Sequence, residues 1–328
     1  MEFQSFNKIS KISHRKRIRF IKKSNFNSKK NIQRIFGIPN LGNTCYLNSI
    51  LQIIIRNPFL KEILLSKQLI SNDGLIKVLR MLIRLVYKIN KHEKRRIPTR
   101  KNLENFISQI YSNLFTLNSN YQTHISYDAL VFLRDLINII IEDETLDTFI
   151  KSKIKHIFFG ERLNSFFCNN CGTIEEFSET FLDLNLSTHP KQENISINLN
   201  GLINKDDFYS ISFLLSQNFL DEILENFYCE KCDKSVDVRI LKRLTKIPLT
   251  VAVSTSIPYE NFHFENQITI GENLYKLQGM VLYNKHMQHY ISKILINEKF
   301  YYFNDMVVEE NILDESSYTI IMLIYNLL

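Results

Sequence analysis

The sequence predicts an α+β fold, in which a helical first half is followed by a strand-rich second half. Apolar residues recur at helical spacing between about residues 44 and 142, whereas alternating and β-branched segments dominate after about residue 156. The composition of the 328-residue chain, 45% hydrophobic and 23% charged, is that of a globular protein with a substantial core. These patterns place a functional site at the junction of the two halves.

The helices are predicted from the spacing of apolar residues and from end signals. The first follows the N-cap pair Asn43-Thr44, carries apolar residues at i, i+3, i+4 and i+7 from Leu47, and ends at Asn57-Pro58. Further helical patterns fill residues 60–90, 101–116, 126–142 and, in the second half, 210–225.

The strands are predicted from alternation and from β-branched content. They are expected at residues 177–186, 236–241, 249–253, 275–282, 290–296, 299–303 and 318–324. The last segment is the most apolar, but it is far shorter than the ~20 residues needed to cross a bilayer. We therefore expect no membrane association.

The positive charge is concentrated at the N-terminus. Residues 1–34 hold 11 Lys and Arg and one acid, Glu2, whereas the remainder holds 30 bases and 33 acids. We expect a disordered basic tail over residues 1–34 and a folded domain over residues 35–328. A near-neutral domain disfavours a specific nucleic-acid partner, whereas the tail suits a nuclear signal or an anionic contact.

Four of the five cysteines form two C-x-x-C pairs, Cys168 with Cys171 and Cys229 with Cys232, separated by 57 residues. Each pair can grip one metal from a single turn, and four thiolates in a tetrahedron select Zn²⁺ at about 2.3 Å. Because no coordination position is left open, we predict one structural zinc per chain. The alternative is two redox-active or disulfide pairs.

The fifth cysteine, Cys45, falls in the first turn of a predicted helix. The free N–H groups and the positive end of the helix dipole there stabilise a thiolate. Gly42 permits a tight turn, and Asn40 can aim a side-chain N–H at a developing oxyanion beside the backbone N–H of Cys45. The alternative is a small core residue at a helix start. An odd cysteine count without a secretory signal indicates a reducing compartment, the cytoplasm or nucleus.

Residues 37–52 resemble the cysteine box of the ubiquitin-specific protease family. The matching residues are Gly37, Asn40, Gly42, Asn43, Thr44, Cys45, Tyr46, Asn48, Ser49, Leu51 and Gln52. The resemblance implies a papain-like cysteine protease with a thumb over about residues 35–155 and a palm and zinc-bearing fingers over about 156–328. It also implies cleavage after the C-terminal glycine of ubiquitin.

Two later segments extend the resemblance. Residues 127–133 are similar to the family's Gln-Asp-Ala-x-Glu-Phe-Leu helix, with Tyr127 and Val131 replacing Gln and Glu. The family uses the aspartate to hold the ubiquitin tail, which implies substrate binding by Asp128; the alternative is a helix-capping acid. Around the second cysteine pair the similarity is close, but Ser254-Thr255 stands where the family has Arg-Phe.

Two segments, His289-Tyr290 and Phe303-Asn304-Asp305, resemble the histidine box of the family. His289 is the expected base and Asn304 its orienter, accepting from Nδ1–H and leaving Nε2 for Cys45. Asp305 should point to the opposite face of an extended strand, so we expect it, like Tyr290, to contact substrate. His286 is the rival base.

The family's loop ahead of the base is changed and shortened in this sequence. Gln288 stands where a glycine is expected, and Phe300 occupies the position of the family's tryptophan. The short loop bears on how substrate fits more than on the chemistry.

The resemblance explains all five cysteines and favours a thiol-dependent deubiquitinase that acts by Cys-His-Asn catalysis. Its expected partners are ubiquitin and ubiquitinated proteins, and its expected state is a monomer. The alternatives are an isopeptidase for another ubiquitin-like modifier and a catalytically silent ubiquitin-binding scaffold. A nucleic-acid-binding zinc protein is disfavoured by the charge of the domain.

Overall fold

The computed structural model describes one compact unit within the chain. The described residues are 34–66, 74–87, 97–117, 119, 121–122, 124–186, 209–219, 221–258, 262–310 and 316–328. Apart from Arg34, the predicted basic tail lies outside them. None of the helices within these ranges is long and apolar enough to span a membrane.

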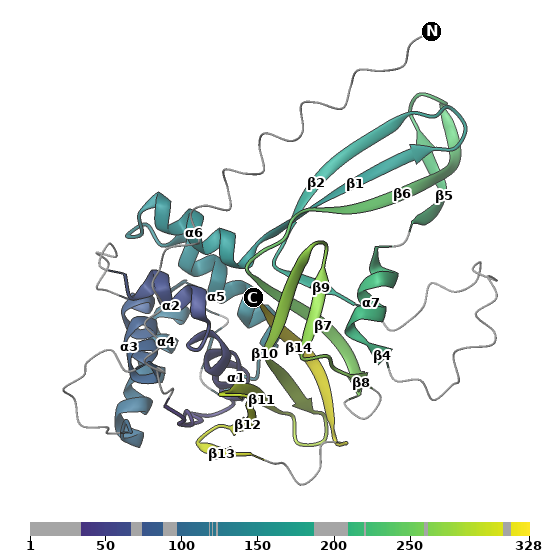
Figure 1. Cartoon of the computed structure of the whole chain (residues 1–328). Coiled ribbons are helices and arrows are strands. Elements are labelled where there is room, and N and C mark those ends of the chain that lie inside the picture. Colours follow the sequence, from purple (N-terminus) through teal and green to yellow (C-terminus); the bar gives the residue numbers. More distant parts are fainter. Residues whose placement is uncertain are drawn as a thin grey trace. The chain divides into compact units, whose positions relative to one another are not determined.

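Helices occupy the described part of the first half, as the apolar spacing predicted (Figure 1). They are α1 (Cys45–Ile54), α2 (Pro58–Leu64), α3 (Gly74–Val86), α4 (Arg100–Leu117), α5 (Ala129–Glu142) and α6 (Thr148–Phe158). Side-chain caps begin four of them: Asn57 accepts from the N–H of Leu60 in α2, Thr99 accepts from the N–H of Asn102 in α4, and Asp128 and Asp147 cap α5 and α6. Helix α6 was not predicted, although its buried residues follow helical spacing.

The second half forms a large, mainly antiparallel sheet with the strand order β13-β12-β11-β10-β14-β7-β3, and β9 pairs with β10. In chain order these strands are β3 (Asp183–Asn185), β7 (Thr250–Pro258), β9 (Gln267–Ile270), β10 (Asn273–Asn284), β11 (His289–Ile296), β12 (Lys299–Asn304), β13 (Val307–Glu309) and β14 (Tyr318–Leu327). Only β3, at the edge beside β7, runs parallel to its neighbour.

Both faces of this sheet are covered by a hydrophobic core, and neighbouring side chains along a strand point alternately into one core and the other. On β10, Val281 packs into the core formed with the helices, whereas Leu282 packs into a second core. Helix α1 contacts β10, β11 and β12 on the first face. Helix α7 (Ile211–Asn218) supplies side chains to the second core. The first residues of α1 are thereby held against the first residue of β11.

A second, four-stranded sheet has the order β2-β1-β6-β5. Its strands are β1 (Gly160–Cys168), β2 (Ile174–Phe181), β5 (Glu222–Cys229) and β6 (Lys234–Lys246), and Figure 1 shows it extending beyond the large sheet. Strands β4 (Tyr209–Ser210) and β8 (Phe262–His263) pair in parallel and form a separate two-stranded sheet. The α+β class is thus confirmed.

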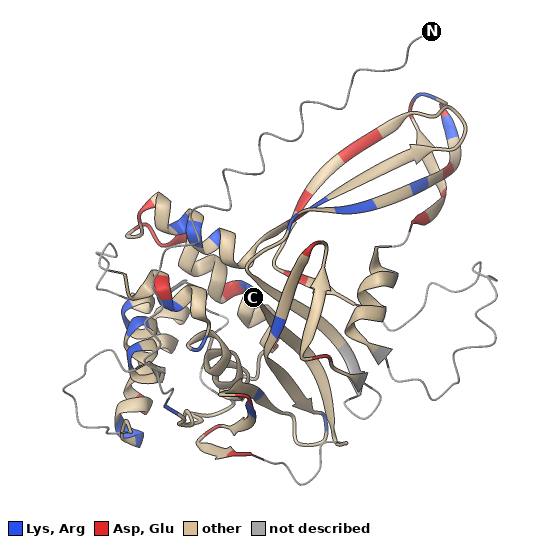
Figure 2. Ribbon diagram, in the orientation of Figure 1, with Lys and Arg blue, Asp and Glu red and all other residues tan. Residues whose placement is uncertain are grey.

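The four-stranded sheet corrects one prediction. The helix expected over residues 210–225 ends at Asn218, and the chain becomes strand β5 from Glu222. Pairing with β6, which aligns Glu222 with Ile240, overrides the local helical spacing. Acidic and basic segments are mixed along these strands (Figure 2), and Lys242 pairs with Glu222 across the sheet.

Candidate active site

Cys45 is the first residue of α1 and is 3% exposed. It follows a tight turn that we call the nucleophile loop, residues 40–44. Gly42 and Asn43 both have positive φ, 104° and 53°. The side-chain oxygen of Asn40 accepts from the backbone N–H of Gly42 (2.9 Å) and of Thr44 (3.2 Å), which closes the turn. The free N–H groups of the helix start therefore lie beside the thiol.

The structure places His289, rather than His286, beside Cys45. His289 opens β11, against which α1 packs, whereas His286 is exposed in the turn between β10 and β11. A hydrogen bond with the Cys45 side chain is the largest of the effects that raise the pKa of His289 to about 9, opposed by burial and helped by Asn304. The imidazole is therefore protonated at neutral pH.

The last residue of β12, Asn304, lies on the other side of the imidazole. Its Oδ1 is 2.8 Å from Nε2 of His289. The ring orientation expected from the sequence was wrong, because Nε2 faces Asn304 and Nδ1 is left for the thiol. Phe303, 2% exposed and 4.7 Å from the guanidinium of Arg56, anchors the strand end beneath this contact.

Strand alternation predicted that Asp305 points away from His289, and this prediction was wrong. Strand β12 ends at Asn304, and Asp305 adopts a left-handed backbone with φ 50°. Its carboxylate consequently lies 3.7 Å from Nε2 of His289 and accepts from the side-chain amides of Asn40 (2.9 Å) and Asn48 (2.7 Å). The backbone of this turn also accepts from Ile38, so Asp305 joins the nucleophile loop to the orienter.

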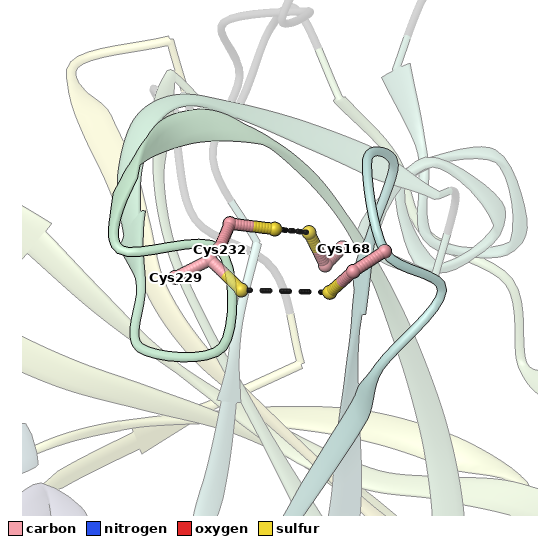
Figure 3. A group of neighbouring side chains, drawn as sticks. Cys168, Cys229 and Cys232 are labelled. Carbon is pink, nitrogen blue, oxygen red and sulfur yellow. Dashed lines mark hydrogen bonds between the residues drawn. The ribbon is translucent and has the colours of Figure 1, made fainter.

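The four remaining cysteines meet at the ends of two hairpins (Figure 3). Cys168 and Cys171 flank the turn between β1 and β2, and Cys229 and Cys232 flank the turn between β5 and β6. Pairing of β1 with β6 brings the two turns together despite the long gap in sequence. The Sγ atoms all lie within 4.8 Å of one another, which fits a bound metal ion.

Polar groups support this cluster. Thr173 Oγ1 lies 3.0 Å from Sγ of Cys171, and hydrogen bonds from the side chain and backbone of Thr173 lower the pKa of Cys171 to about 6. Asn170 donates to Sγ of Cys232 at 3.2 Å. These two contacts favour the thiolates that a metal requires, although, against the hydrogen bond from Asn170, burial and hydrogen bonds with the other three cysteines raise the pKa of Cys232 to about 12.

Comparison with known proteins decides the family. The family model described as ubiquitin carboxyl-terminal hydrolase matches residues 36–325. The chain belongs to the ubiquitin carboxyl-terminal hydrolase family. The hydrolase is 25% identical to ubiquitin carboxyl-terminal hydrolase 12 of Salmo salar over 333 residues, 85% of this chain and 82% of that protein. It is 24% identical to ubiquitin carboxyl-terminal hydrolase 23 of Arabidopsis thaliana over 232 residues, 66% of this chain and 24% of that protein.

The fold of the hydrolase is shared with a solved structure of the SAGA Ubp8/Sgf11/Sus1/Sgf73 DUB module bound to ubiquitin aldehyde. The TM-score is 0.66 at 18% identity, covering 92% of this chain and 71% of that chain. The papain-like arrangement is therefore confirmed, with helices α1 to α6 as thumb, the large sheet as palm and the four-stranded sheet as fingers. The hydrolase is a cysteine peptidase of the deubiquitinase class.

Two residues expected to bind substrate are Asp128, which precedes α5, and Tyr290, which lies in β11 close to Asp128. Asp128 is exposed, and its Oδ1 caps the helix by accepting from Leu130 and Val131, so it takes the capping position that was the alternative interpretation. Tyr290 is 7% exposed and packs on Tyr283, with ring centroids 4.6 Å apart. Burial, followed by the charge of Asp128, raises the pKa of Tyr290, which keeps its hydroxyl neutral.

The sequence did not single out Asn48, although it matched the family there. It lies on a buried turn of α1 at 3% exposure, and its amide bridges the carbonyl of Pro39 and the carboxylate of Asp305. The available signal was a row of polar residues at helical spacing, Thr44, Asn48 and Gln52, all of which are buried in the structure. At the family departure, the Ser254 hydroxyl donates to Asp183 (2.7 Å), which in turn binds Arg134.

We expect Asn304→Ala to lower kcat roughly 10²-fold, because the imidazole loses its orienter. Asp305→Ala should cost at least as much, a larger effect than the sequence alone suggests, because it removes the acceptor of two amides. It should also lower the free energy of unfolding by about 1–3 kcal/mol, because the buried amide of Asn48 loses a partner. Steady-state kinetics and denaturant unfolding of both variants test this. An Asp305→Ala protein with wild-type kcat contradicts it.

The pH profile should report His289. Because its pKa is raised, His289 in the folded protein keeps its proton as the pH rises from 6.5 to about 9. The stability and activity that depend on the imidazolium are therefore present below pH 6.5 and are lost as the pH rises through about 9. We expect kcat/KM to fall with a basic limb near pH 9. The limb should move to lower pH in Asn304→Ala and to higher pH in Asn304→Asp, whose carboxylate stabilises the imidazolium. An unmoved limb in both variants would assign the titration to another group.

Proposed function

We propose that the chain hydrolyses the (iso)peptide bond after the C-terminal glycine of ubiquitin by Cys-His-Asn nucleophilic catalysis. One observation carries the proposal: His289 lies between the Cys45 thiol and Asn304, with hydrogen bonds to both. That is the nucleophile, base and orienter of a thiol hydrolase.

The residues of the site divide the reaction between them. His289 takes the proton of the Cys45 thiol, the sulfur attacks the glycine carbonyl carbon, and the C–N bond breaks as His289 gives that proton to the leaving amine. Water then attacks the thioester as His289 takes one of its protons, the C–S bond breaks to release the Cys45 thiolate, and the second proton passes to solvent as the ubiquitin carboxylate forms. An imidazolium with a pKa of about 9 suits the transfer to the leaving amine, because it is charged at neutral pH.

The oxyanion of each tetrahedral intermediate needs N–H donors. The backbone N–H of Cys45 lies at the free start of α1. The Asn40 amide gives one hydrogen to Asp305 and, since an amide has two, keeps one for the oxyanion. Asp305 thereby acts on the site through Asn40, in addition to any contact with substrate. Asp128 and Tyr290 remain our candidates for contacts with the ubiquitin tail.

We also propose that the cysteine cluster holds one structural Zn²⁺ per chain. The Sγ atoms of Cys168 and Cys232 are 3.7 Å apart, as are those of Cys171 and Cys229. Four Zn–S bonds of about 2.3 Å in a tetrahedron require sulfur separations of about 3.8 Å. All four ligands come from protein, so the ion would stabilise the fingers and take no part in hydrolysis.

Side-by-side reaction with electrophilic probes tests the substrate. We expect a probe built on the C terminus of ubiquitin to label the protein, and probes built on ubiquitin-like modifiers to react at least tenfold more slowly. Faster labelling by another modifier would reassign the substrate. Binding of ubiquitin without labelling by any probe would instead indicate the silent scaffold. The solved relative bound to ubiquitin aldehyde supports the ubiquitin assignment.

For the whole chain we propose a monomer in the cytoplasm or nucleus, directed by the basic tail. The tail carries 11 Lys and Arg against one acid, whereas the domain is near neutral. Deleting residues 1–34 should change the distribution of the protein in cells and leave its reaction with a ubiquitin probe intact. Light scattering checks the monomer; loss of the reaction on deletion would show that the tail belongs to the catalytic unit.

A further inference from the structure

We propose that His124 is a positioning residue that holds the nucleophile loop from its outer side. The inference rests on the proposed function, in which the oxyanion donors, the Asn40 side chain and the backbone N–H of Cys45, lie at the two ends of this loop. It adds a residue from the connection between α4 and α5 to the site.

The inner side of the loop is already well held. Asn40 accepts from Gly42 and Thr44, and Thr44 Oγ1 accepts from the N–H of Leu41 at 3.0 Å. Neither contact restrains the outer side, where Gly42 and Asn43 adopt positive φ and Asn43 is exposed.

His124 contacts this outer side in three ways. Its backbone N–H donates to the carbonyl of Gly42 (3.2 Å), and its carbonyl accepts from the Asn43 side-chain amide (2.6 Å). Its ring lies flush against Gly42, so that a Cβ there would come within 2.3 Å of Nδ1. Glycine at position 42 is thus required both by its φ and by the imidazole.

His124 is itself held on both flanks. Tyr121, 1% exposed, donates to Asp135 of α5 (2.5 Å). On the other flank, Asp128 caps the start of α5. The backbone of His124 has φ 74°, a left-handed conformation that histidine tolerates better than alanine. The segment that carries His124 is therefore attached to α5 on both sides, and the exposed imidazole lies over Gly42.

The contacts predict which kinetic constant responds. A loop free to shift misplaces the N–H donors of Asn40 and Cys45 by fractions of an ångström, which weakens stabilisation of the oxyanion more than binding of the ground state. The candidate contacts with the ubiquitin tail, Asp128 and Tyr290, do not include His124. Loss of the ring should therefore lower kcat and leave KM nearly unchanged.

The experiment compares four full-length proteins with a ubiquitin that carries a C-terminal coumarin amide. We expect His124→Ala to lower kcat about tenfold with KM within twofold of wild type. His124→Phe, which keeps an aromatic ring over Gly42, should retain kcat within about threefold. Gln122→Ala is the matched control, since Gln122 is exposed in the same segment and, among the described residues, its side chain donates a hydrogen bond to the carbonyl of Ser119 and none to residues 40–44.

The outcomes separate this inference from the proposed function. If wild type and Gln122→Ala turn over ubiquitin normally but His124→Ala does too, His124 has no positioning role. A loss confined to KM, or an equal loss in His124→Phe, also overturns it. If wild type itself fails to turn over the substrate, the proposed function fails first. Thermal unfolding of each variant checks whether a substitution at exposed position 124 changes the stability of the fold.

Discussion

Replacing Cys45 by Ala should abolish hydrolysis, with kcat reduced by at least about 10⁴-fold. The change removes one sulfur from the start of α1 and leaves the loop contacts of Asn40 and Asp305 in place. The fold and ubiquitin binding should therefore persist. Turnover of a ubiquitin amide and calorimetric binding of ubiquitin measure the two effects separately.

Cys45 should be the one cysteine that an electrophilic ubiquitin probe modifies. The other four thiols are gathered at the tips of the fingers and are expected to be bound to metal. Peptide mapping after labelling identifies the site. Labelling that persists in Cys45→Ser would show that the nucleophile has been misassigned.

Removal of the metal should unfold the fingers. Strands β2 and β5 are largely exposed, so the four-stranded sheet has few buried apolar side chains apart from Val238 and Ile240. A structural zinc contributes roughly 10–16 kcal/mol of apparent binding energy at pH 7, which is coupled to folding. We expect Cys171→Ser to lose zinc, to expose the amides of β1, β2, β5 and β6 to hydrogen exchange, and to lower solubility.

Cys45→Ser is the matched control for this change, because it replaces a thiol remote from the cluster. It should retain one equivalent of zinc and wild-type exchange in the fingers. Elemental analysis of freshly purified, reduced wild type measures the metal directly. Less than a tenth of an equivalent of zinc, in protein whose fingers are folded, would refute a structural zinc.

Motifs confined to a short window were predicted well. The helix start at Cys45 and the two C-x-x-C turns depend on contacts within a few residues, and the structure shows each where the sequence indicated. Segments whose secondary structure depends on pairing with a strand elsewhere in the sequence were predicted less well. Residues 222–225 have helical spacing, yet they form a strand because β6 supplies hydrogen-bond partners.

The site shows the same division. The sequence named Cys45, His289 and Asn304, but it assigned the wrong ring nitrogen to Asn304 and the wrong face to Asp305. Ring orientation depends on how β11 and β12 meet α1. The face of Asp305 depends on one left-handed residue that ends the alternation of β12.

By itself, the sequence determined the family, the α+β class and the residue types that carry the chemistry. The family, the fold class and the residue types could be predicted because they depend on residues close together in the sequence, namely apolar periodicity, a cysteine at a helix start and two C-x-x-C turns. The tertiary structure alone decided that Asp305 joins Asn40 to Asn48 and that His124 lies against Gly42. Contacts between residues more than 80 positions apart leave no periodic trace in a single sequence, because they arise only when packed helices and paired strands bring the two segments together.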